Sequence, residues 1–160
     1  MSRESARPTI REATAGDLDL VASMNRALLD DTRHRNPMDV AALRRRLDAL
    51  LADGWQADLV VHEDRVVGYA LHRQEVDPGE PGRQRHHLRQ FLIAREDRRR
   101  GLGRAAFAAL AAARFAPGAR VVLEVLTTNE AGRRFWQSVG FGAYAETLEW
   151  QVAAADDARS

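Results

Sequence analysis

Apolar residues in three segments of the chain recur every three or four positions, which is the spacing of one face of an α-helix. Two of these segments lie early in the chain, and the third is rich in alanine and ends at Pro117-Gly118. A shorter helix is expected after Asn129, closed by Gly140. Thr14 begins a capping box, and Asn36-Pro37 has the form of an N-cap and first helical turn. The expected helices span residues 18–29, from residue 37 to near Gly54, 102–115 and 129–139.

The segments between these helices are short and either alternate or are uniformly apolar, as expected for β-strands. Glu63-Asp64 makes the turn of a hairpin, and the Pro- and Gly-rich residues 78–82 form a loop. The expected strands are Thr9–Ala13, Trp55–His62, Val66–Gln74, His86–Ala94, Arg120–Leu126 and Tyr144–Val152. The order β-α-α-β-β-β-α-β-α-β predicts a single α/β domain over residues 1–152 and a flexible tail over residues 153–160.

The composition excludes several classes of function. Of the 160 residues 45% are hydrophobic, and 24 Lys+Arg oppose 23 Asp+Glu for a net charge of +1, so no nucleic-acid partner is expected. The chain has no cysteine, which excludes disulfides and thiolate catalysis. It shows neither the apolar core of a secretory signal nor a run long enough to span a membrane, so we expect a cytoplasmic protein without a membrane partner.

Arginines gather at the start of the alanine-rich helix, in the segment Arg98 to Arg104, called here the phosphate turn. Unpaired backbone N–H groups and the helix dipole favour an anion at such a helix start. Glycines let the anion approach the backbone, and arginines add charge-assisted hydrogen bonds. The segment lacks residues that a Walker A loop or a dinucleotide-binding fingerprint requires. The turn predicts a phosphate-bearing ligand, although an exposed arginine-rich helix start is the alternative; its residues are Arg98, Arg99, Arg100, Gly101, Leu102, Gly103 and Arg104.

A second motif follows the phosphate turn at a matched separation. It comprises Glu124 to Asn129, the aromatic pair Phe135-Trp136 and Gly140-Phe141. Together the two motifs resemble the GNAT superfamily of N-acetyltransferases, whose members carry an Arg/Gln-x-x-Gly-x-Gly/Ala turn after the fourth strand. The resemblance covers most of the chain and is strongest from Ile93 to Phe141. It implies a central mixed sheet splayed open between its fourth and fifth strands, with acetyl-CoA (coenzyme A) bound in the opening.

The resemblance also implies where the cofactor is held. Backbone groups of Phe91, Leu92 and Ile93 would bind the pantetheine amides, and the N–H groups of the phosphate turn would bind the pyrophosphate. Asn129 would contact the pantetheine arm, and Phe135 and Trp136 would line the thioester end.

For the chemistry, the resemblance implies direct attack of an amine on the thioester in a ternary complex. Glu124, within the expected apolar strand, is the candidate base, with an ion pair to a neighbouring arginine as the alternative. The N–H of Ile93 is the expected oxyanion donor. Trp136 stands where the family usually has a tyrosine acid; Tyr144 is a substitute if it faces inward, and otherwise water serves. A non-catalytic acyl-CoA-binding protein therefore remains an alternative function.

The acceptor would bind around the connection between the first two helices. Polar residues there can equally be solvated, and a metal site from the histidines is not expected because no carboxylate pattern accompanies them. Nothing in the sequence identifies the amine, a small molecule or a protein, or decides between a monomer and a homodimer. The candidate acceptor contacts are Asp30, Asp31, His34, Arg35 and Gln90.

Overall fold

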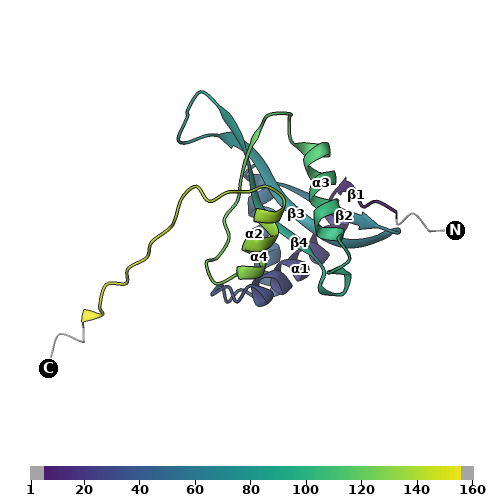
Figure 1. Ribbon diagram of the computed structural model, residues 1–160. Coiled ribbons are helices and arrows are strands. Elements are labelled where there is room, and N and C mark those ends of the chain that lie inside the picture. Colours follow the sequence, from purple (N-terminus) through teal and green to yellow (C-terminus); the bar gives the residue numbers. More distant parts are fainter. Residues whose placement is uncertain (1–5, 156–160) are drawn as a thin grey trace.

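The computed structural model describes residues 6–155, which form one mixed sheet with helices on both faces (Figure 1). Within these residues no helix is both long enough and apolar enough to cross a membrane. The strands are β1 (Thr9–Glu12), β2 (Gln56–His62), β3 (Arg65–Val76), β4 (Gln84–Ile93) and β5 (Arg120–Val122). The helices are α1 (Leu18–Asp31), α2 (Val40–Ala52), α3 (Leu102–Arg114) and α4 (Glu130–Ser138), with 3-10 turns η1 (Ala15–Asp17) and η2 (Arg95–Asp97).

The sheet runs in the order β1-β2-β3-β4-β5, antiparallel except for the parallel pair β4 and β5. Alternate residues of its central strands face opposite layers, as the pleat requires. Leu59, Tyr69 and Leu71 pack against α1 and α2. Val60 and Val67 pack against α3 on the other face, Val67 because a bulge in the β2–β3 pairing shifts the alternation there. The two cores hold helices on both faces of the sheet, so its central strands are buried between two layers.

The sheet opens between β4 and β5. The two strands pair only where Arg85 to His87 lie beside Arg120 to Val122. β4 continues to Ile93, whereas the chain after Val122 leaves the sheet and reaches α4. The space between β4 and residues 123–126 is called the notch below. The mixed sheet splayed between its fourth and fifth strands, expected from the family resemblance, is therefore confirmed.

Two sequence predictions need correction. Helix α2 is capped by Asp39, which accepts a hydrogen bond from the Ala42 N–H at 2.8 Å, and not by Asn36. Asn36 forms a local turn instead, because its Oδ1 accepts from the Met38 N–H at 2.9 Å. The fifth strand ends at Val122, four residues early, because it separates from β4 there.

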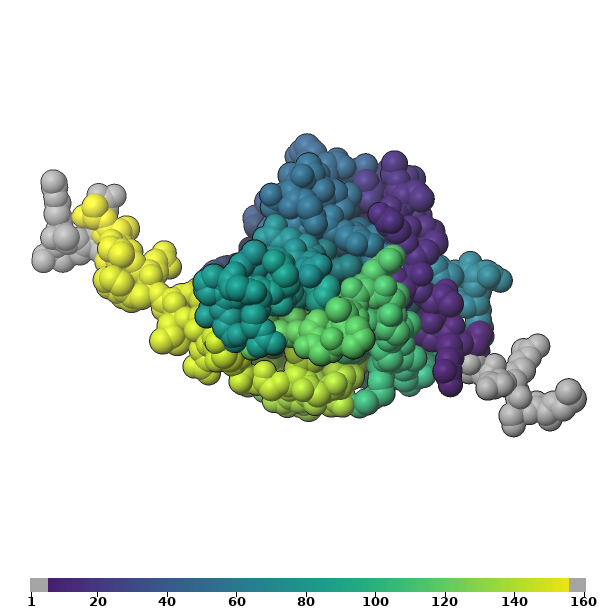
Figure 2. Space-filling model, turned by 90° about the horizontal axis from the view of Figure 1, so that it is seen from above, coloured from purple at the N-terminus to yellow at the C-terminus, as the bar shows by residue number. Residues whose placement is uncertain are grey.

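The last predicted strand, residues 144–152, does not form. Residues 142–155, called the arm below, are extended and run away from the sheet (Figures 1 and 2). Alternation identifies a segment that can be a strand, but a strand also needs a hydrogen-bonded neighbour, and none of the described residues supplies one here. Of the predicted tail, residues 156–160 lie outside the described residues.

Candidate active site

The phosphate turn has a backbone conformation that opens α3 to an anion. Gly101 is the N-cap of α3 in the left-handed region, at φ 70°, and Arg99 has φ 65°. A left-handed residue just before a helix turns successive N–H groups toward one side, which suits an anion. A Cβ on Gly103 would lie 3.2 Å from the ring of Phe135, so glycine lets α3 approach α4 closely. Both glycines of the motif thus have a structural requirement.

The four arginines of the turn have different surroundings. Arg98 donates to the Ile93 carbonyl at 2.7 Å and to Asp31 at 2.7 Å. Arg104 donates to the carbonyl of Ser138, at the end of α4, at 2.7 Å. The side chains of Arg99 and Arg100 are exposed. Arg98 and Arg104 therefore hold the turn in place, and Arg99 and Arg100 are the side chains open to an incoming phosphate.

The notch edge of β4 carries backbone groups that β3 does not pair, although the Ile93 carbonyl accepts from Arg98. The Ala94 N–H donates to Val67 on β3 at 2.8 Å, and the Leu92 carbonyl lies against Gly68 on the same strand. Because successive residues of a strand point their polar groups to opposite sides, those of Phe91 and Ile93 point into the notch. Of the three predicted pantetheine contacts, Phe91 and Ile93 thus present backbone groups there, and Leu92 belongs to the β3 side.

Aromatic side chains form the wall of the notch on the α3 and α4 side. Trp136 lies at their centre, with ring centroids 5.5 Å from Phe91, 5.4 Å from Phe107 and 5.3 Å from Phe141. Phe135 stacks on Phe91 at 6.3 Å. Apolar rings at such separations pack as a core, so Trp136 is anchored in the position where the family usually has a tyrosine. At the end of this wall Asn129 caps α4, accepting from the Gly132 N–H at 3.0 Å.

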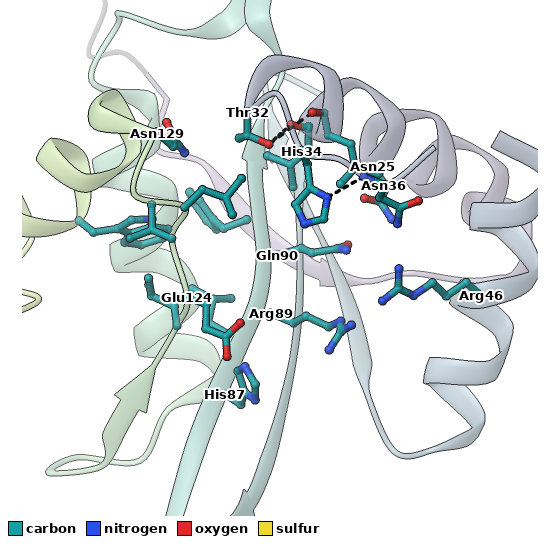
Figure 3. A pocket seen from close by; sticks show the side chains of 18 residues that line it. Asn25, Thr32, His34, Asn36, Arg46, His87, Arg89, Gln90, Glu124 and Asn129 are labelled. Atoms are coloured by element: carbon teal, nitrogen blue, oxygen red, sulfur yellow. Dashed lines mark hydrogen bonds between the residues drawn. The ribbon is translucent and has the colours of Figure 1, made fainter. Parts of the chain in front are cut away.

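A cavity of about 300 Å³ opens between the notch and the connection from α1 to α2 (Figure 3). It is called the polar cavity below. Figure 3 shows Arg89 reaching into it from β4 and Arg46 from α2, while the Glu124 carboxylate is directed toward His87. Asn129 and Trp136 also line it, so it is continuous with the aromatic wall. The lining side chains with polar groups are Asn25, Thr32, His34, Asn36, Arg46, His87, Arg89, Gln90, Glu124, Asn129 and Trp136.

Hydrogen bonds and rings hold several of these groups in place. His87 lies 2.8 Å from the Glu75 carboxylate and edge-on to Trp55 at 5.1 Å between centroids. Gln90 accepts from the Tyr69 hydroxyl at 2.9 Å. Full burial raises the pKa of Tyr69, so this hydroxyl stays protonated and keeps donating to Gln90.

Glu124 does not sit in the enclosed apolar strand that the sequence suggested. Because β5 ends at Val122, Glu124 lies on the diverging segment and is exposed toward the cavity. No described arginine forms an ion pair with it. Its carboxylate is thus available to a bound molecule.

The predicted acceptor contacts separate into two groups. His34 and Gln90 line the polar cavity. Asp30 pairs with Arg26, Asp31 with Arg95 and Arg98, and Arg35 with Glu149 of the arm, and none of these three lines it. Tyr144, the candidate acid, is 92% exposed on the arm and lies outside the cavity.

Two cavity residues, Asn25 and Arg46, were missed from the sequence. Asn25 lies four residues after Val21 and four before Leu29, on the buried face of α1, and a polar residue on an apolar helix face was a signal that could have been used. Arg46 had no such signal, because α2 carries arginines at three successive positions and the pattern does not say which one reaches a cavity. Among the described residues no group of three or more side chains could hold a metal ion.

The fold and the site together combine a split sheet, a helix start that is open to an anion and a polar cavity. The chain belongs to the acetyltransferase (GNAT) family, whose pattern matches residues 22–141. No curated protein sequence matches the chain with statistical significance.

Solved structures share the fold at low sequence identity. A possible acetyltransferase from Clostridium difficile 630 is 22% identical, with TM-score 0.72 and coverage of 93% of this chain and 100% of that one. The aminoglycoside N-acetyltransferase AAC(6')-Iy in complex with CoA is 14% identical, with TM-score 0.71 and coverage of 96% and 100%. A predicted acetyltransferase from Clostridium acetobutylicum, with acetyl-CoA, is 17% identical, with TM-score 0.70 and coverage of 90% and 96%.

Proposed function

We propose that the protein is an N-acetyltransferase that transfers the acetyl group of acetyl-CoA to a primary amine bound in the polar cavity. The observation that carries this proposal is that Glu124 lines a cavity that also includes Phe91, on the notch edge of β4, and Trp136 of the aromatic wall. Acetyl-CoA would supply the acetyl group as an activated thioester. Membership of the GNAT family supports acetyl-CoA as the cofactor, and the carboxylate in the cavity supports the reaction.

The residues present fit this cofactor. The left-handed Gly101 and the start of α3 present N–H groups for a pyrophosphate, with Arg99 and Arg100 beside them. The notch-facing backbone groups of Phe91 would pair with an amide of the pantetheine arm, as a further strand would, and the Ile93 N–H would remain for the thioester carbonyl. Phe135 and Trp136 exclude water from the inner end of the notch.

In the proposed reaction Glu124 accepts the proton that the attacking ammonium must lose. The amine nitrogen forms a bond to the thioester carbonyl carbon, the Ile93 N–H stabilises the negative charge on the carbonyl oxygen, and the bond from carbon to sulfur breaks. The acylated nitrogen loses a second proton, which water carries to the departing thiolate. We assign no tyrosine to this step, because Trp136 is packed among aromatic rings and Tyr144 lies outside the cavity.

The direct test is release of free CoA thiol, followed with a thiol reagent over a panel of amines. Because the chain has no cysteine, the protein itself gives no background in this assay. Turnover of any amine class supports the proposal. Tight acetyl-CoA binding without turnover of any amine would refute it in favour of a non-catalytic acyl-CoA-binding protein.

A further inference from the structure

Positively charged side chains outnumber negatively charged ones in the polar cavity. Arg46 and Arg89 both line it, whereas Glu124 is the one carboxylate among its described lining residues. The neighbouring Glu75 is already engaged by Arg73, Arg85 and His87. The cavity therefore has a negative end at Glu124 and an excess of positive charge toward α2.

The two arginines have no carboxylate partner among the described residues. The guanidinium of Arg89 instead lies over the Trp55 ring, 5.3 Å from its centroid. Arg73 lies over the same ring at 4.4 Å but is paired with Asp53. Stacking on Trp55 fixes the direction of Arg89 while leaving its N–H groups able to donate.

The local electrostatics favour an incoming anion. Partial desolvation, followed by the charge of Arg46, lowers the pKa of Arg89, and Glu124 acts in the opposite direction. Two guanidinium groups that repel each other are stabilised when a shared anion lies between them. A ligand with several positive charges would meet the reverse effect.

A buried acceptor atom marks the same cavity as a binding site. Asn25 is only 8% exposed and lines the cavity, and its Oδ1 is buried without a hydrogen-bond partner. An unpaired buried oxygen costs free energy, so a donor from a bound molecule would be stabilising here. Nothing else in the described structure satisfies this atom.

We propose that the acceptor is a small amine that also carries an anionic group, a carboxylate or a phosphate. Arg46 and Arg89 bind the anion, and the ammonium is directed to Glu124. This inference rests on the proposed function and narrows its substrate class. The proposed substrate class distinguishes the protein from enzymes with polycationic acceptors, such as the aminoglycoside N-acetyltransferase AAC(6')-Iy.

Matched acceptor pairs test the inference in the thiol-release assay: amino acids against their carboxamides, and an amino sugar against its phosphate ester. We expect kcat/KM at least about 10-fold higher for the anionic member of a pair. Arg46→Gln and Arg89→Gln should remove most of that preference, because each lowers kcat/KM more for the anionic member than for the neutral one. A preference for carboxylates or for phosphates identifies which anion is bound.

Arg45→Gln is the matched control, since Arg45 is exposed on the same helix and does not line the cavity. The inference is overturned if neutral or polycationic amines are better substrates, or if Arg45→Gln changes the preference as much. If no amine releases thiol, calorimetric binding of the same pairs distinguishes the two claims. An anionic amine that binds the wild type but not Arg46→Gln then supports the anion site and refutes catalysis.

Discussion

Arg98 donates from Nε to the carbonyl oxygen of Ile93 at 2.7 Å, and so joins the phosphate turn to the end of β4. The same guanidinium reaches Asp31 at the end of α1, also at 2.7 Å. Arg98, the first residue of the motif, thus connects three elements: the phosphate turn, the strand that borders the notch and helix α1. The two ends of the proposed reaction path are held in a fixed relation by one side chain.

Arg98→Ala should therefore weaken both stability and cofactor binding. We expect a loss of about 1–2 kcal/mol in the free energy of unfolding, since hydrogen bonds to a charged group are removed at a partly exposed site. The KM for acetyl-CoA should rise several-fold because the turn loses its attachment to β4. Urea unfolding and thiol-release kinetics measure the two effects. Arg100→Ala, which removes an exposed arginine of the same turn, should leave stability within about 0.5 kcal/mol.

Gly101→Val should affect the cofactor more than the fold. A β-branched residue at φ 70° is strained by about 1–2 kcal/mol, and relief of that strain would turn the N–H groups of the α3 start away from the anion. We expect the KM for acetyl-CoA to rise at least about 10-fold with a modest fall in melting temperature. Gly82→Val is the control, because Gly82 lies in the β3 to β4 turn with open space around its Cα and no positive φ. Unchanged acetyl-CoA affinity in Gly101→Val would remove the turn from the binding site.

Much of the fold was accessible from periodicity because each helix has one buried face. Val21 and Leu29 of α1, Leu43 and Leu47 of α2, and Leu110 of α3 are all buried at helical spacing, as predicted. The final strand was not accessible in the same way. The alternation of the arm is real, but whether such a segment pairs depends on a neighbouring edge that no local pattern describes.

The part of the candidate site that a local backbone motif forms could be predicted from the sequence. The part that depends on side-chain pairs distant in the sequence could not. The helix start at Gly101 needs only a local conformation. By contrast, the acidic Asp31 was expected to face a substrate, and the structure pairs it with Arg95 and Arg98, which lie more than sixty residues away in the sequence. Arg46 and Glu124 meet the same cavity from separate elements, and only the folded arrangement brings them together.

A buried ion cluster on the α3 side of the sheet should make stability depend on acidic pH. Asp58 is fully buried and accepts from Arg114 at 2.6 and 2.9 Å and from His72 at 2.7 Å. Burial alone would raise the pKa of Asp58, but the hydrogen bonds from His72 and Arg114 outweigh it and hold the pKa below its ordinary value.

Because the folded-state pKa is depressed, the stabilisation is present above the unfolded value of about 4 and is lost as pH falls through the lower folded value. At neutral pH Asp58→Asn should cost about 3 kcal/mol, since it removes a fully buried carboxylate and leaves the half-buried guanidinium of Arg114 without its partner. The difference in the free energy of unfolding between wild type and variant should narrow below about pH 4. Urea unfolding from pH 7 to pH 3 measures this difference, and a difference that does not change with pH would contradict a depressed pKa of Asp58. Asp64→Asn, at the exposed turn from β2 to β3, should behave like the wild type.

Glu124→Gln should lower kcat without unfolding the protein or weakening acetyl-CoA binding. The change removes the proton acceptor but keeps the size of an exposed side chain, so the free energy of unfolding should stay within about 0.5 kcal/mol. Loss of a general base costs about 100-fold or more in rate when the amine is protonated. Raising the pH should then restore part of the activity in the variant, because the acceptor loses its proton to solvent before binding.

The measurement is a pH profile of kcat/KM for wild type and variant with the best acceptor found. Glu63→Gln, at the exposed turn from β2 to β3, should match the wild type throughout. A variant that lost activity by the same factor at every pH would show that Glu124 positions the amine and does not take its proton.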